Sequence, residues 1–186
     1  RLASHDFKML RRIWNHANLT AITKLRIYMA CVVSKLLYGL QSAWLTKGQR
    51  SKLDGFYARC SRTFLGIMPS FWNRISNLEV FQRLHTYPLS RLLLEQQLLF
   101  FGKLFRKSNE DISRSPVFVA SSSSLVEDEL PRTRGRPHLQ WSGGMRRYAI
   151  EIAGEESKIE ESLEDEKNVR RRCDKFVGNP KSQDEE

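Results

Sequence analysis

Several residue types that mark particular protein classes are scarce in this chain of 186 residues. It has three cysteines, Cys31, Cys60 and Cys173, with no CxxC pair and no histidine at zinc-ligand spacing, which argues against a disulfide framework and a zinc site. The longest apolar stretch, residues 27–40, is interrupted by Lys35 and is too short to span a bilayer. We therefore expect a protein of a reducing compartment that does not enter a membrane.

Carboxylates are also scarce where a catalytic site would need them. Residues 1–120 contain six, namely Asp6, Asp54, Glu79, Glu95, Glu110 and Asp111. None follows an apolar strand, the context that presents paired carboxylates to magnesium ions. The four histidines have no spacing typical of a metal site or triad, and no GxSxG, P-loop or GxGxxG motif occurs. We therefore expect no catalytic site and no cofactor in this chain.

Positive charge, in contrast, is abundant and unevenly distributed. The chain has a formal net charge of +10. Residues 1–120 hold 19 Lys and Arg against 6 Asp and Glu, whereas residues 151–186 hold 7 against 12. The cationic character thus belongs to the apolar, foldable part. A basic folded body favours a polyanionic partner such as DNA or RNA, although a basic surface that only maintains solubility is the alternative.

Apolar residues recur at helical spacing along much of the chain, and this pattern predicts an all-α fold. We expect helices over residues 5–17, 21–40, 49–65, 76–84, 88–106 and 138–152. Gly66 is the expected end of the third helix, and Ser76 with Glu79 forms a capping-box sequence. The helix over 88–106 is apolar nearly all round, so we expect it to be buried in the chain's own core or against a partner.

The helical pattern fades after residue 107. The serine run 121–124, the acidic residues that follow it and Pro131 indicate a flexible surface linker. The acidic region after Gly154 predicts a solvated helix over 160–172, followed by disorder. The chain is thus divided into helices of residues 1–45, a helical region 46–107, a basic and serine-rich linker 108–137, and a short helix with a charged, partly disordered tail, 138–186.

Five blocks of sequence carry a family resemblance. They are LLYGLQSAW (36–44), FYARCSRTFLGI (56–67), WNRISNLEV (72–80), FFGKL (100–104) and RGRPHLQW (134–141). Their order, over residues 8–145, resembles the region after the polymerase palm in non-LTR (LINE-type) retrotransposon reverse transcriptases. Members of that family often have leucine at the position of Ser61 and arginine at that of Thr63. These departures fit a divergent or a decayed copy of such an element.

The resemblance implies the thumb and post-thumb region of an RNA-directed DNA polymerase, with thumb helices in residues 1–45 and post-thumb helices in 46–107. The palm, with its magnesium-binding aspartates, would precede Arg1 in a longer protein. Mg²⁺ is therefore implied for the parent polymerase and not for this fragment, from which we expect no polymerase activity alone. The implied partners are RNA, DNA or an RNA–DNA hybrid and the upstream palm, in an intracellular, nuclear location.

Twelve basic and aromatic positions are predicted nucleic-acid contacts. They are Lys24, Arg26, Lys35, Arg50, Lys52, Arg59, Arg62, Trp72, Arg74, Arg132, Arg134 and Arg136. Cations of this kind contact phosphates, so binding would be sequence-independent and salt-sensitive; each could also be an ordinary solvated charge. Arg59 and Arg62 are expected to share one exposed face. Trp72 is the predicted base-stacking residue, whereas Tyr38 and Trp44 are predicted core residues.

Other functions remain open at this point. The segment RTRGRP (132–137) resembles an AT-hook core, so a stand-alone DNA-binding protein that prefers A·T-rich DNA is one alternative. A helical interaction module that docks a protein partner through residues 92–105 is another. A non-functional reading frame left by a dead element is the third.

Overall fold

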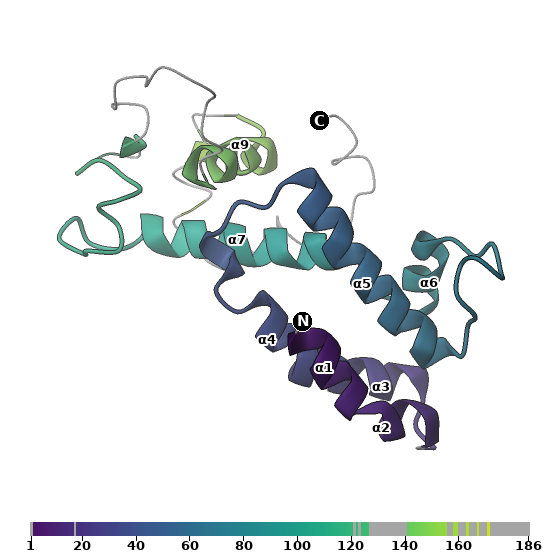
Figure 1. The fold of residues 1–186 in the computed structure, drawn as a ribbon. Helices are drawn as coiled ribbons and strands as arrows, with labels where there is room; N and C mark the ends of the chain where they lie inside the picture. The colour runs from purple at the N-terminus through teal and green to yellow at the C-terminus, as the bar shows by residue number, and fades with distance from the viewer. Residues whose placement is uncertain are drawn as a thin grey trace. The chain divides into compact units, whose positions relative to one another are not determined.

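The structure, a computed structural model, describes residues 2–16, 18–120, 122, 124–126, 141–155, 158, 159, 163, 167 and 171. In these residues every regular element is a helix, and the one β feature is an isolated bridge between Phe118 and Leu125. The predicted all-α class is therefore confirmed (Figure 1). The chain forms two compact units. Unit 1 comprises Arg1–Gly39 and Leu45–Leu92, and unit 2 comprises Leu40–Trp44 and Leu93–Glu186.

Unit 1 contains the helices of the first half of the chain. They are α1 (Leu2–Met9), α2 (Arg11–His16), α3 (Ala21–Tyr28), the π-helical turn η1 (Met29–Val33), α4 (Ser34–Leu37), α5 (Lys47–Leu65) and α6 (Asn77–Arg83). The single helix predicted over 5–17 is thus two helices that meet at Leu10. The helix predicted over 21–40 ends at Leu37 and includes the π turn. Unit 1 joins segments that the sequence pattern had divided after residue 45.

Local capping explains where α5 and α6 begin and end. Thr46 and Gln49 form a reciprocal capping box, so α5 starts two residues earlier than its apolar pattern predicts. Gly66, with φ of 66°, ends α5 in the left-handed conformation that glycine adopts without steric cost, as predicted. The hydroxyl of Ser76 accepts a hydrogen bond from the Glu79 amide at 3.1 Å and caps α6. The Ser76 half of the predicted capping box is therefore confirmed.

A continuous series of aromatic rings forms the core of unit 1. We call this series the aromatic column; its members are Phe7, Trp14, Phe64, Tyr28, Tyr57 and Phe81. Neighbouring rings lie 5.1–5.8 Å apart along it, a separation at which aromatic pairs stabilise by about 0.5–1.5 kcal/mol beyond their buried area. Because the rings come from α1, α2, α3, α5 and α6, the column holds all five helices together.

Helix α7 (Leu89–Phe105) is capped by a carboxylate of α5 rather than by a residue of its own segment. Asp54 accepts hydrogen bonds from the backbone N–H of Ser90 at 2.8 Å and from its hydroxyl at 2.6 Å. Burial raises the pKa of Asp54, and the two bonds from Ser90 oppose that effect. Asp54 therefore serves as a structural cap that satisfies a backbone donor at the start of α7.

Unit 2 is organised around the remainder of α7. Its core contains Leu94, Leu98, Phe101, Leu104, Phe118, Leu125, Met145, Ala149, Ile159 and Leu163. The last helix bounded in full is α9 (Trp141–Ala153), and the short turn η2 (Leu40–Ser42) accepts a hydrogen bond from the buried amide of Gln97. The apolar helix predicted over residues 88–106 was expected to be buried either in the chain's own core or against a partner. The structure places it in the chain's own core.

The prediction of a flexible linker from residue 108 is wrong for its described part. Phe118 and Leu125 are 2% and 1% exposed and contribute to the unit 2 core. The buried guanidinium of Arg114 donates hydrogen bonds to the carbonyls of Val119 at 3.2 Å and Ser122 at 2.9 Å. These local hydrogen bonds, together with the burial of Phe118 and Leu125 in the unit 2 core, hold a segment whose composition is typical of a linker. Residues 127–137 lie outside the described residues.

The tail also differs from the expected solvated helix. Ile159 and Leu163 are 7% and 4% exposed and belong to the unit 2 core. Arg106 donates a hydrogen bond to the carbonyl of Leu163 at 2.6 Å. The acidic composition of the region thus concealed two apolar side chains that contribute to the core.

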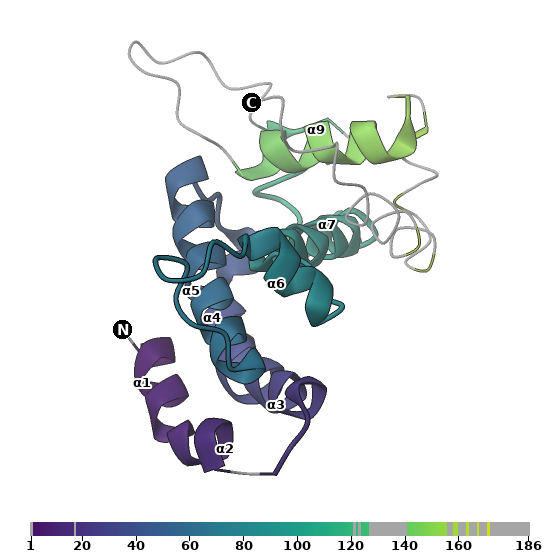
Figure 2. The same ribbon diagram turned by 90° about the vertical axis from the view of Figure 1, so that its right-hand side faces the viewer.

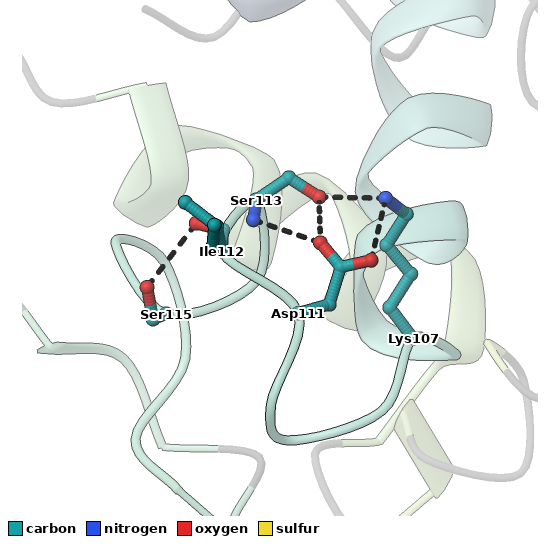
Figure 3. A network of polar contacts seen from close by, with 5 residues as sticks. All are labelled: Lys107, Asp111, Ile112, Ser113 and Ser115. Carbon is teal, nitrogen blue, oxygen red and sulfur yellow. Dashed lines mark hydrogen bonds and ion pairs between the residues drawn. The ribbon is translucent and has the colours of Figure 1, made fainter.

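A polar network shapes the loop after α7 (Figure 3). The carboxylate of Asp111 accepts from the Lys107 ammonium at 3.0 Å, and from the amide and hydroxyl of Ser113 at 2.8 and 2.5 Å. These hydrogen bonds, with the positive charge of Lys107, lower the pKa of Asp111 to about 2. The ionised carboxylate is therefore the form that holds the loop.

Helix α9 contains a glycine, Gly144, in its first turn. Trp44 lies against Gly144, and a Cβ at that position would overlap the six-membered ring of the indole. Tyr148, one turn further along α9, places its ring 6.2 Å from that of Trp44. Gly144 is thus required by close packing. At Gly55, in the middle of α5, an added Cβ would meet nothing within 4 Å.

We predict that the same substitution at these two helical glycines has opposite effects. Gly55→Ala should stabilise the protein by about 0.5–1 kcal/mol, because alanine restricts the unfolded chain and fits the helix. Gly144→Ala should destabilise it by roughly 1–3 kcal/mol, because the methyl group displaces Trp44. Urea unfolding of the two variants measures both free energies. Equal effects of the two substitutions would contradict the packing described for Trp44.

The Asp111 network predicts an acid-sensitive loop. A carboxyl whose pKa is lowered on folding stabilises the folded state above its unfolded pKa, and that contribution is lost as the pH falls through the folded pKa. Because the pKa of Asp111 falls from its ordinary value of 3.8 to about 2 on folding, the loss should occur between about pH 4 and pH 2. NMR titration of the Ser113 amide should show a midpoint near 2, and Asp111→Asn should abolish the transition. A midpoint near 3.8 would show that the network is absent.

Candidate nucleic-acid interface

Unit 1 carries a large excess of positive charge. Residues 1–92 contain fifteen Lys and Arg against three carboxylates, a net charge of +12. All three carboxylates are engaged: Asp6 pairs with Lys35 at 3.1 Å, Glu79 pairs with Arg83 at 2.6 Å, and Asp54 caps α7. Most of the cations of unit 1 therefore face no acidic side chain of their own unit, and a polyanion would be attracted to them.

Helix α5 presents two of the predicted contact residues on one exposed side. Lys52 and Arg59 are exposed and lie seven residues apart, which places them on the same side of a helix two turns apart. Neither forms an ion pair within the part of the chain that the structure describes. Gly55 lies between them, and its surface is open. We call Lys52, Gly55 and Arg59 the basic face of α5.

The other cations predicted on the first helices have different environments. Arg26 is exposed on α3. Lys35 is exposed but paired with Asp6. Lys24 is half-buried, and its ammonium donates a hydrogen bond to the carbonyl of Trp14 at 2.8 Å, where it satisfies the end of α2. Lys24 therefore has a structural role that its position on a basic, amphipathic helix does not indicate.

Arg50 and Arg74 complete the predicted cations of unit 1 apart from Arg62. Arg50 is half-buried on α5 and takes part in interactions within the chain. Arg74 is exposed in the loop between α5 and α6. Arg132, Arg134 and Arg136 lie outside the described residues, so the AT-hook-like strip has no structural description.

The expectation that Arg59 and Arg62 share an exposed face is wrong, because Arg62 is buried. Its side chain is 5% exposed, and its guanidinium donates to the carbonyl of Ile75 at 2.6 Å and to the Asn77 amide oxygen at 3.2 Å. Longer bonds reach the Asn73 amide oxygen at 3.4 Å and the Met68 carbonyl at 3.5 Å. Arg62 thus anchors the segment between α5 and α6 and is removed from the candidate interface.

That anchored segment, residues 67–76, exposes two large aromatic side chains. We call it the aromatic loop; it joins α5 to α6, which lie side by side in both views (Figures 1 and 2). Phe71 and Trp72 are 86% and 72% exposed. Their rings lie 5.3 Å apart, edge to face at 89°. Arg74 is the one charged residue of the loop. Trp72, the predicted base-stacking residue, is thus exposed, as is Arg74 in the same loop.

Two aromatic positions differ from the sequence prediction. Tyr38, predicted in the core, is 87% exposed, because it follows the last residue of α4 and its backbone has left the helical conformation. Phe71 was not among the predicted contact residues. The signal for both was local: Tyr38 directly precedes Gly39, and Phe71 follows Pro69 and Ser70, residue types that end helices or begin turns.

Groups suited to catalysis or metal binding do not gather in the described residues. No cluster of three or more His, Cys, Asp or Glu occurs among them. The Cys60 thiol lies in the unit 1 core, where burial raises its pKa to about 11 and keeps it neutral. Among the described helices, none is long and apolar enough to cross a membrane.

Comparison of the chain with protein-family models, curated protein sequences and solved structures found no match. The candidate interface therefore rests on the charge, exposure and hydrogen bonding of its own residues. Those residues are the basic face of α5, Arg26 on α3, and the aromatic loop with Arg74.

We predict that Arg62→Ala destabilises the protein by roughly 3 kcal/mol, because it removes a buried guanidinium together with the hydrogen bonds by which it holds residues 68–77. Arg62→Lys should recover little of this loss, since an ammonium cannot reproduce the forked geometry of a guanidinium. The matched control is Arg59→Ala, the exposed arginine three residues earlier on the same helix, which should change stability by less than about 0.5 kcal/mol. Chemical denaturation measures all three variants. Similar losses for Arg62→Ala and Arg59→Ala would contradict the anchoring role.

Proposed function

We propose that this chain binds the phosphate backbone of RNA or DNA through unit 1. The observation that carries the proposal is the unbalanced positive charge of that unit, whose three carboxylates are all engaged in ion pairs or a helix cap. Lys52 and Arg59 then provide exposed donors on one side of a rigid helix. Cations on a helix neutralise phosphates and release condensed counterions, which supplies most of the affinity in sequence-independent binding.

The arrangement favours recognition of backbone over sequence. Contacts to phosphates position a nucleic acid but carry no sequence information. The basic face of α5 contains Gly55 between its two cations, so it offers no side chain there that could read a base edge. We therefore infer binding that depends on salt and on nucleic-acid geometry, with little dependence on sequence.

We further propose that the chain is the thumb and post-thumb region of an RNA-directed DNA polymerase of a non-LTR retrotransposon. The ordered blocks from LLYGLQSAW to RGRPHLQW support this proposal. In that setting unit 1 would hold the template–primer duplex, and a palm domain elsewhere in the parent protein would supply the magnesium site. The apolar residues of helix α7 are buried in the chain's own core. This burial favours binding through the basic surface over docking of a protein partner on α7.

The test is fluorescence-anisotropy binding to an RNA–DNA hybrid, A·T-rich DNA and mixed-sequence DNA across a salt series. The logarithm of the binding constant should fall steeply with the logarithm of salt concentration, and the three ligands should differ little. The double variant Lys52→Ala/Arg59→Ala should weaken binding to all three. Its salt slope should be shallower by about 2, since each lost phosphate contact removes about 1.

Lys103→Ala is the control for lost charge, because Lys103 is an exposed cation on the part of α7 that belongs to unit 2. It should leave the salt slope unchanged. A strong preference for A·T-rich DNA would instead support an AT-hook-like protein. Absence of binding at low salt would overturn the proposed function.

A further inference from the structure

We propose that the aromatic loop is a binding site for unpaired bases of single-stranded RNA or DNA, which stack on Phe71 and Trp72. This inference rests on the proposed function, because unit 1 supplies the charge that attracts the strand. It adds a distinct specificity. The basic face of α5 would bind any backbone, whereas the loop would favour a ligand that has bases free to stack.

The exposure of the two rings is the first observation. Phe71 and Trp72 are 86% and 72% exposed, and Met68 in the same loop is 59% exposed. Within the described part of the chain, the one ring contact of Phe71 or Trp72 is with the other. Large apolar side chains exposed so near one another in sequence, two of them in contact, are a feature that marks interaction sites.

The loop is held in place from both sides, although its tip is exposed. At its start, the carbonyl of Pro69 accepts hydrogen bonds from the backbone N–H groups of Trp72 at 2.9 Å and Asn73 at 3.3 Å, which forms a turn. At its end, Arg62 holds the carbonyl of Ile75 and the side chain of Asn77. Because the backbone is fixed before a ligand arrives, less conformational entropy is lost on binding.

The charge of the loop identifies the occupant. Residues 67–76 contain Arg74 and no carboxylate, and the basic face of α5 ends with Arg59 two turns before the loop begins. Aromatic rings combined with cations are the elements that bind single strands, because every base has a face that stacks and every nucleotide has a phosphate. Glu79, three residues after the loop, is already paired with Arg83.

The relative orientation of the two rings favours one kind of ligand, a single-stranded overhang, over another, the blunt end of a duplex. The planes of Phe71 and Trp72 are 89° apart. The end of a duplex presents one flat base pair, which cannot lie parallel to two perpendicular rings. Separated bases of a flexible strand can adopt a different orientation on each ring. The geometry therefore favours an unpaired overhang, such as the template strand beyond a primer end, over the blunt end of a duplex.

The test uses the full chain and four labelled ligands: a blunt duplex, the same duplex with a single-stranded overhang, that duplex with an abasic overhang, and the overhang strand alone. Anisotropy should show tighter binding to the base-containing overhang than to the blunt or abasic duplex. Phe71→Ala/Trp72→Ala should weaken binding to the base-containing overhang and to the single strand by about tenfold or more, and binding to the blunt duplex by much less.

Tyr38→Ala is the matched control, because Tyr38 is as exposed as Phe71 but lies outside the loop. It should leave all four affinities unchanged. Trp72→Phe should retain most of the preference for the overhang, since an aromatic face remains. The two loop residues are exposed, so the double variant should keep the melting temperature of the parent protein, and this is measured first.

The outcomes separate this inference from the proposed function. Equal affinity for base-containing and abasic overhangs would overturn the inference. So would a preference for the overhang that survives Phe71→Ala/Trp72→Ala. In either case, binding to the blunt duplex would still support the proposed function. If the protein binds none of the four ligands, both the inference and the proposed function are overturned. Vesicles of phosphatidylserine provide one further arm. The double variant could abolish vesicle binding and leave overhang binding unchanged. That result would assign the loop to an anionic membrane surface and overturn the inference.

Discussion

The aromatic column is the constraint on which unit 1 depends. Its rings come from five helices, and α5 supplies two of them, Tyr57 and Phe64. Once those rings face the core, helical geometry fixes the direction of every other side chain of α5. Lys52 and Arg59 then lie on the exposed side, whereas Arg62 is buried by the segment that follows the helix. The candidate interface is thus a geometric consequence of how the core is built.

Because the aromatic column supplies the cohesion of unit 1, the unit can be stable with few carboxylates and a large excess of positive charge. An ion pair at an exposed site contributes little to stability, commonly below 1 kcal/mol, so the fold gains little from balancing its surface cations. The carboxylates of unit 1 occupy positions with specific structural effects, of which the Asp54 cap on α7 is the clearest. Cohesion comes from aromatic and aliphatic burial instead. The surface is therefore left strongly cationic without loss of a core interaction.

Local pattern accounted for the fold class, for most helices and for the caps at Gly66 and Ser76, because hydrophobic period and capping act over a few residues. It did not account for Arg62, whose partners lie six to fifteen residues further along the chain. It also misjudged the segment after residue 108, where contacts from Arg114 and Phe118 override a linker-like composition. For Arg62 and Phe118 the missing information was a contact with a more distant part of the chain, whereas Tyr38 and Phe71 lie in local contexts that end helices or begin turns.

Two buried arginines show how a basic composition can misrepresent a binding surface. Arg62 and Arg114 are each 5% exposed, and each directs its guanidinium at backbone carbonyls of a loop without regular structure. A buried guanidinium that donates to carbonyls of its own chain is not available at the surface to hold a phosphate. Its effect on binding must then be indirect, through the loop that it shapes. For Arg62 that loop carries Phe71 and Trp72, so an arginine withdrawn from the surface still determines which aromatic faces the surface presents.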